Sequence, residues 1–128
     1  KILEYRKNFS GSNEGFIKNW PKDFALYGWL VSIKSGGKLD AHIHREGWLS
    51  GSIYLKMPKK RNPQEGNILF GLRGSDYPDE GKDYPQQEYD VTEKSLVLFP
   101  SSLYHQTLPF SSDENRISFA FDVMPSRE

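Results

Sequence analysis

The chain has 128 residues, of which 36% are hydrophobic and 14% aromatic, and this is enough to build one core. Its 17 Lys and Arg residues balance 17 Asp and Glu residues, so no basic excess favours nucleic-acid binding. The absence of cysteine excludes disulfides and cysteine-ligated metal sites, and no apolar run is long enough to span a membrane. We predict a single domain over residues 1–128, located in the cytoplasm, which could be part of a longer protein because the chain starts at Lys1.

Taken in chain order, the predicted elements are almost all strands. Residues 8–20 could form one short helix, although their Gly and Asn content weakens it. Residues 24–33 are apolar and rich in aromatic and β-branched side chains, which favours a strand, and a Ser-Gly-Gly turn follows. The further predicted strands are 39–44, 50–57, 67–72, 87–92, 95–99 and 117–124. This pattern of short strands separated by turns predicts an all-β sandwich or barrel.

Two of the three histidines stand one residue apart, in the stretch AHIHREGWLSG. In a strand, His42 and His44 would point to the same face with their Cα atoms roughly 6–7 Å apart. Asp40 and Glu46 follow the same alternation, so either could add a carboxylate. Two imidazoles on one face suit a metal ion, but a histidine pair alone is more often part of an ordinary polar strand.

The third histidine strengthens the metal hypothesis. His105 follows the apolar run SLVLF and the break made by Pro100, so it is expected at the mouth of a buried strand. Arg116 opens the last predicted strand, and alternation puts Ser118, Ala120 and Asp122 on its face. All three histidines and one arginine thus fall at strand ends, which favours a site over four unrelated surface residues.

At this point the order of motifs resembles a small branch of the iron(II)/2-oxoglutarate-dependent oxygenase superfamily. The matching stretches are His-x-His, Leu-Ser-Gly-x-x-Tyr-x-x-x-Pro, Leu-Val-Leu-Phe-Pro-Ser-x-x-x-His and Arg-Ile-Ser-x-x-Phe, at 42–44, 49–58, 96–105 and 116–121. Together they cover roughly residues 28–124. The resemblance implies a double-stranded β-helix, which is a cupin-like jelly roll, with at most short helices.

The resemblance also implies roles for particular residues. His42, His44 and His105 match positions that bind Fe(II), and Arg116 matches the residue that pairs with the C5 carboxylate of 2-oxoglutarate. A planar guanidinium can hold a carboxylate through two charged hydrogen bonds. Ser118 matches the hydroxyl that assists Arg116, and Tyr54 could line the same cavity. The implied activity is a dioxygenase that hydroxylates a small-molecule or peptide substrate.

One departure from the superfamily pattern matters. The usual motif is His-x-Asp or His-x-Glu, whereas His44 stands here in place of the carboxylate. Three neutral imidazoles would leave the iron with its full charge, unless Glu46 or Asp40 is the ligand instead. A three-histidine cupin-like metalloenzyme that does not use 2-oxoglutarate and a non-enzymatic binding barrel therefore stay open as alternatives. A homodimer formed by pairing of edge strands also stays open.

Overall fold

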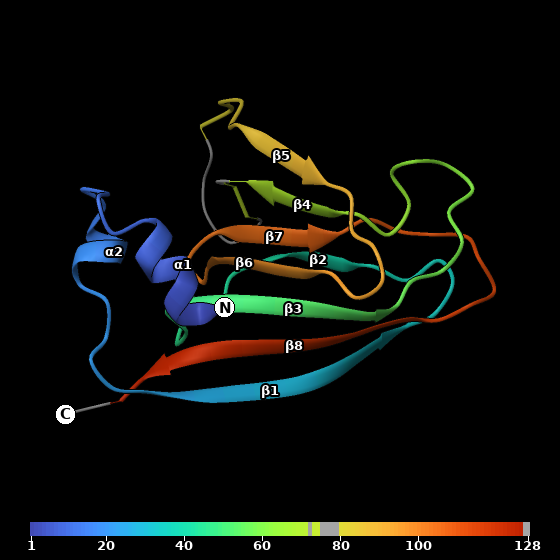
Figure 1. The fold of residues 1–128 in the computed structure, drawn as a ribbon. Coiled ribbons are helices and arrows are strands. Elements are labelled where there is room, and N and C mark those ends of the chain that lie inside the picture. The colour runs from blue at the N-terminus through green and yellow to red at the C-terminus, as the bar shows by residue number, and fades with distance from the viewer. Residues whose placement is uncertain (72, 75–79, 127–128) are drawn as a thin grey trace.

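The computed structural model describes residues 1–71, 73–74 and 80–126, which form two facing β-sheets and two short helices (Figure 1). Sheet A has the strand order β1-β8-β3-β6, and sheet B has the order β2-β7-β4-β5. The helices are α1 (Ile2–Asn8) and α2 (Gly15–Lys18), and the strands are β1 (Phe24–Ile33), β2 (Leu39–His42), β3 (Leu49–Lys56), β4 (Ile68–Gly71), β5 (Gln86–Tyr89), β6 (Leu96–Pro100), β7 (Tyr104–Thr107) and β8 (Arg116–Pro125).

The chain passes back and forth between the two sheets, and neighbouring strands pair antiparallel. It crosses from β1 in sheet A to β2 in sheet B, returns to A for β3, and goes to B for the β4–β5 hairpin. β6, β7 and β8 then fall in A, B and A. This is the double-stranded β-helix that the sequence resemblance implied, and the prediction is confirmed.

The main core lies between the sheets. It is built from Tyr54, Ile68, Phe70, Val91 and Phe99, all at most 6% exposed. Because side chains alternate along a strand, the even-numbered residues of β3 up to Tyr54 and of β8 from Arg116 to Asp122 face this interior, and the odd-numbered residues between them face outward. The interior face is therefore where polar residues of these two strands would meet a site.

A second cluster packs on the outer face of sheet A. Leu49 and Val123, which pair across β3 and β8, are fully buried there together with Trp20. Apolar side chains of α1 and α2 complete this cluster, and Figure 1 shows both helices gathered at one end of the sheets. The helices thus cover one end of the outer face and leave the interior face free for the site.

Most predicted strands occur within one or two residues of their predicted bounds, with three differences. Strand β2 ends at His42, so His44 lies in the following loop and not on the strand. Strand β7 was not predicted, and it places His105 inside a strand between β2 and β4. The one short helix predicted within 8–20 is found there as the four-residue α2, and α1, which was not predicted, precedes it. Leu72, the last residue of the strand predicted at 67–72, lies outside the described residues. None of the helices in the described ranges is long and apolar enough to cross a membrane.

Candidate metal centre

The three histidines converge on one point inside the fold. His42 on β2 and His105 on β7 are cross-strand partners, which places their rings side by side, with centroids 4.3 Å apart. The ring of His44, two residues after His42, lies next to both of these rings. Its centroid is 5.3 Å from that of His42 and 5.0 Å from that of His105. One nitrogen from each ring lies within 4.8 Å of the others, so a single metal ion could contact all three.

The hydrogen bonds of the Nδ1 atoms fix which nitrogen faces this point. Nδ1 of His42 contacts the backbone carbonyl of Asp40 at 2.7 Å, and Nδ1 of His105 contacts that of Leu103 at 3.1 Å. Because a carbonyl oxygen only accepts, each Nδ1 carries the proton and donates it. The Nε2 atoms then present lone pairs, which is the arrangement typical of metal-ligating histidines.

The separation of two of these nitrogens fits a shared metal. Nε2 of His42 and Nε2 of His44 are 3.3 Å apart. With both Nδ1 atoms protonated, two lone pairs face each other at this distance, and a cation between them removes the repulsion. Metal–nitrogen bonds of about 2.1 Å at ordinary coordination angles give a similar separation. The donor set therefore fits a divalent transition metal.

His44 differs from the other two histidines in what holds it. Its Nδ1 contacts Oδ1 of Asp122 at 2.6 Å, on the interior face of β8. The Ser50 hydroxyl donates to the same oxygen at 2.6 Å and lies 2.7 Å from the Ser101 hydroxyl. Asp122 and both serines are buried. This network ties the loop after β2 to sheet A.

His105 is the most buried of the three. Its ring packs against Phe99, with centroids 4.5 Å apart, and against Phe70 at 6.2 Å. Burial lowers the pKa of His105 to about 4, because the protonated form would lose its hydration among apolar neighbours. His105 is therefore neutral near pH 7, which is the form that binds metals.

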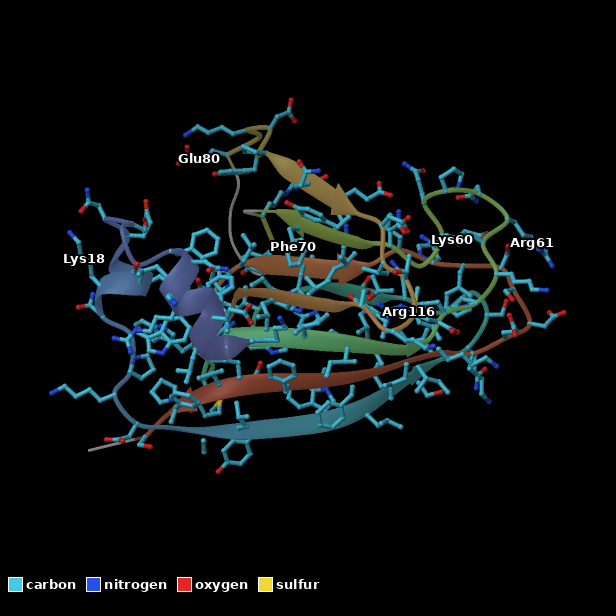
Figure 2. All side chains as sticks on the ribbon, viewed as in Figure 1. Lys18, Lys60, Arg61, Phe70, Glu80 and Arg116 are labelled. Atoms are coloured by element: carbon cyan, nitrogen blue, oxygen red, sulfur yellow. The ribbon has the colours of Figure 1, made fainter. Side chains whose placement is uncertain are left out.

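Arg116 lies on the same interior face, at the start of β8 (Figure 2). Its guanidinium carbon is 4.9 Å from the centre of the Tyr54 ring, and Tyr54 pairs across the strands with Ser118. All three residues are at most 3% exposed. Burial lowers the pKa of Arg116 and raises that of Tyr54, and an arginine nevertheless keeps its charge.

Two polar atoms of this group have no protein partner. Nε of Arg116 and the Tyr54 hydroxyl are buried without a hydrogen bond. No ion pair joins Arg116 to a carboxylate among the described residues, which include every part of the chain outside 72, 75–79 and 127–128. A buried, unpaired cation of this kind is a site for an anion, and a carboxylate fits it in charge and shape.

The two carboxylates considered as alternative ligands are not in the histidine cluster. The Asp40 side chain is 82% exposed and forms an ion pair with Lys38 at 2.8 Å. Glu46 is exposed in the turn before β3. The carboxylate that does reach the cluster is Asp122, which sequence reasoning placed on the Arg116 face without giving it a role. Its signal was only the alternation along β8, because its contact with His44 joins residues 78 positions apart.

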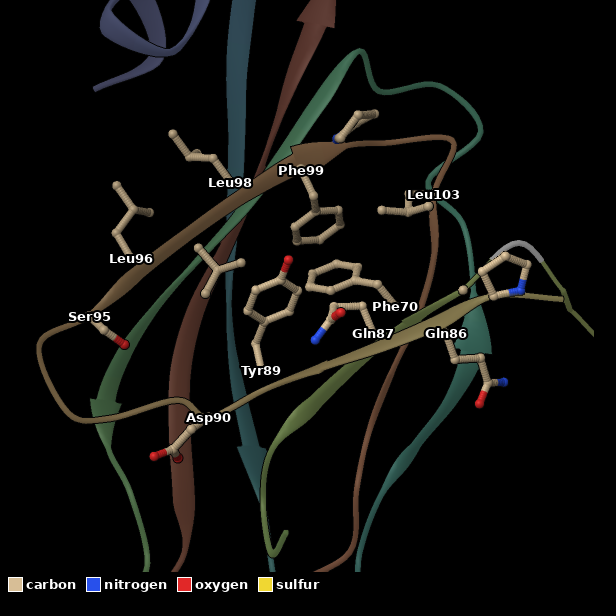
Figure 3. A pocket seen from close by; sticks show the side chains of 14 residues that line it. Phe70, Gln86, Gln87, Tyr89, Asp90, Ser95, Leu96, Leu98, Phe99 and Leu103 are labelled. Carbon is tan, nitrogen blue, oxygen red and sulfur yellow. The ribbon is translucent and has the colours of Figure 1, made fainter. Parts of the chain in front are cut away.

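A groove of about 790 Å³ adjoins the histidine cluster on the side of sheet B (Figure 3). It lies between β5 and β6, the end strands of the two sheets, and Figure 3 shows Phe70, Phe99 and Leu103 facing it. Because Phe70 and Phe99 also contact the His105 ring, these two side chains form a wall between the groove and the cluster.

Comparisons with known proteins identify the family of the chain. Residues 27–122 match the model of a family described as "Putative 2OG-Fe(II) oxygenase", and the chain belongs to this family. No curated protein matches the sequence significantly.

Several solved structures share the fold. A prolyl-4-hydroxylase from Pseudomonas putida is 19% identical, with a TM-score of 0.55 over 98% of this chain and 63% of its own. HygX from Streptomyces hygroscopicus, with iron bound, is 15% identical, with a TM-score of 0.58 over 79% of this chain and 59% of its own. A 2OG-Fe(II) oxygenase family protein from Burkholderia pseudomallei is 11% identical, with a TM-score of 0.61 over 84% and 48%. The chain thus spans about half to two thirds of the length of these proteins.

Proposed function

We propose that this chain is an Fe(II)- and 2-oxoglutarate-dependent dioxygenase whose iron ligands are His42, His44 and His105. The observation that carries the proposal is the convergence of one ring nitrogen from each of the three histidines, with the Nδ1 of every ring held by an acceptor. HygX has been solved with iron and with nickel and 2-oxoglutarate, which supports the same pair of cofactors here. When bound, iron would activate dioxygen, which is the oxidant, and 2-oxoglutarate would supply two electrons as it is converted to succinate and carbon dioxide, so that one oxygen atom enters a C–H bond of the substrate.

The protein's own residues would bind and orient these groups. Arg116 would pair with the C5 carboxylate of 2-oxoglutarate, and Ser118 and the unpartnered Tyr54 hydroxyl would donate further hydrogen bonds to it. The apolar wall of Phe70 and Phe99 would exclude water from the metal on the side of His105. No side chain is needed as a general base, because the cofactors carry the hard chemistry.

The first test is an anaerobic titration. The purified chain is loaded with iron(II), 2-oxoglutarate is added, and the weak visible charge-transfer band of the chelate is recorded. We expect a band in the wild type, weaker iron binding in His44→Ala, and retained iron binding without the band in Arg116→Ala. Arg6→Ala, at an exposed arginine on α1, is the matched control and should keep the band. Loss of iron from Arg116→Ala would contradict the role given to Arg116.

One observation favours a second function. The cluster offers three imidazoles and no directly bound carboxylate among the described residues, a donor set that suits a metalloenzyme independent of 2-oxoglutarate. Iron binding without the charge-transfer band, together with oxygen consumption and no succinate, would establish that function instead. Failure to bind iron at all would leave a non-enzymatic barrel.

We also propose that residues 1–128 form one domain. Support comes from the two core clusters, which draw on strands from both halves of the chain. The cytoplasmic location and the state of oligomerisation stay predictions. The substrate class, a small molecule or a peptide, stays equally untested.

A further inference from the structure

The three histidines of the cluster are not held alike. His42 and His105 donate from Nδ1 to neutral backbone carbonyls, whereas His44 donates to the carboxylate of Asp122. His44 is also the residue that stands where the superfamily motif usually has a ligating carboxylate. The three histidines supply no negative charge to a metal. The nearest carboxylate is that of Asp122, which is hydrogen-bonded to His44 on the side of the ring away from the cluster.

Asp122 is built into this position. It is 8% exposed and lies opposite Ser50 in the β3–β8 register, where the Ser50 hydroxyl donates to the oxygen that also contacts His44. The Ser101 hydroxyl lies 2.7 Å from that of Ser50 and extends the network to the turn directly after β6. Gly47 packs so closely here that a Cβ would lie 2.6 Å from Ser101 Oγ and 3.3 Å from Asp122 Cγ.

Among the described residues, the one basic side chain within ion-pair distance of Asp122 is His44, which carries a charge only when it is protonated. A buried carboxylate is costly unless a cation or several donors stabilise it. A neutral imidazole and one hydroxyl stabilise it in part, and a divalent cation on the far nitrogen of that imidazole would complete the balance.

We propose that Asp122 is a positioning residue that supplies, through His44, the negative charge that a carboxylate ligand supplies in His-x-Asp oxygenases. This inference rests on the proposed function, because it takes His44 as an iron ligand. A short hydrogen bond from Nδ1–H to a carboxylate increases the electron density that Nε2 offers to the metal. It also holds the ring in the tautomer and orientation needed for binding.

The test compares three variants by iron affinity and by the energy of the charge-transfer band. Asp122→Asn keeps the acceptor oxygen and removes the charge. Iron(II) affinity, measured anaerobically by competition with a coloured chelator, should fall by roughly 10–100-fold. With saturating iron and 2-oxoglutarate, the band should move to shorter wavelength, because a less electron-rich iron gives up its electron less readily.

Ser50→Ala tests the same point in the opposite direction. This variant removes the second donor to Asp122 and also the 3.2 Å contact between the Ser50 hydroxyl and Nδ1 of His44. Both changes leave Asp122 as the sole acceptor for that Nδ1–H and the carboxylate more available to it, so the band should move to longer wavelength. Asp90→Asn is the matched control, since Asp90 pairs with Lys60 on the surface and the same chemical change there should alter neither quantity. Circular dichroism of each metal-free variant checks the fold, and Ser50→Ala decides alone if Asp122→Asn does not fold.

The outcomes separate this inference from the proposed function. A wild-type chain that binds no iron overturns both. Normal iron binding with an unchanged affinity and band in Asp122→Asn overturns the role of Asp122 and leaves the proposed function standing. A lower iron affinity with an unmoved band in Asp122→Asn would show that Asp122 only orients the His44 ring. It would contradict the proposal that Asp122 makes the iron more electron-rich through His44. A band that is unmoved or shifted to shorter wavelength in Ser50→Ala contradicts it as well.

Discussion

At the scale of single residues, the burial of His105 has a consequence for stability against pH. Its pKa is about 4 in the folded chain and about 6.5 in an unfolded one, so between these values the unfolded chain binds more protons. The free energy of unfolding of the metal-free protein should therefore fall as the pH drops through this window. We expect a loss of about 2 kcal/mol between pH 7 and about pH 5 from this residue.

Urea unfolding with a metal chelator present checks this prediction. The His105→Gln variant has no group that titrates at this position, so its stability should change less between the two pH values. Equal changes in both proteins would show that other groups cause the pH dependence. Added iron should oppose the effect, because the metal and the proton compete for the same nitrogen.

The residue scale is also where sequence reasoning was least complete. The histidine triad and Arg116 were predicted as a group from motif order, and the structure brings the three rings together and leaves Arg116 unpaired by a carboxylate among the described residues. Asp122, Ser50 and Ser101 had no such signal. Each looks like an ordinary polar strand residue, and three of the contacts that reveal their network join residues 51 to 78 positions apart in the chain.

At the scale of elements, the loop from β2 to β3 determines where His44 points. Gly47 lies in this loop, and its missing side chain leaves room for Ser101 and Asp122. Gly47→Ala should push these groups apart, destabilise the protein by roughly 1–3 kcal/mol, and weaken iron binding by about tenfold or more.

Chemical unfolding and the iron competition measurement together check the Gly47 prediction. Gly11→Ala is the control, since a Cβ at Gly11 would meet nothing within 4 Å and should leave both quantities unchanged. Iron affinity equal to that of the wild type in Gly47→Ala would show that the loop adjusts without moving His44.

Elements were predictable where their pattern was local. The apolar run of β1 was predicted with its observed bounds, because ten consecutive apolar or small residues leave little alternative to a strand. β7 was missed because its sequence, YHQT, is short and polar. It forms a strand because β2 and β4 flank it and supply hydrogen-bond partners on both edges. β2 was predicted two residues too long. Alternation along a strand would place the His44 ring beside that of His42, but in the structure a loop after His42 places it there instead.

At the scale of the whole molecule, the histidine cluster and its hydrogen bonds join the two sheets. His42 and His105 belong to sheet B, and His44 is tied through Asp122 to β8 in sheet A. Bound iron should therefore slow the hydrogen exchange of amides in β2 and β7 more than that of amides in α1. At a free iron concentration 100 times the dissociation constant, global opening should become about 100-fold rarer.

Hydrogen exchange measured by mass spectrometry with and without iron checks this prediction. His44→Ala should lose much of the protection, because one ligand and the tie to sheet A are both removed. Iron-induced slowing confined to the helices, with no change in β2 and β7, would place the metal elsewhere in the molecule.

The link between the sheets also connects the protein's lifetime to the metal supply. A chain that opens more often without iron exposes the core between its sheets to proteases and to aggregation. In a cell short of iron, the empty form would then be degraded sooner than the loaded one. The amount of this protein in the cell would then rise and fall with the available iron, even at a constant rate of protein synthesis.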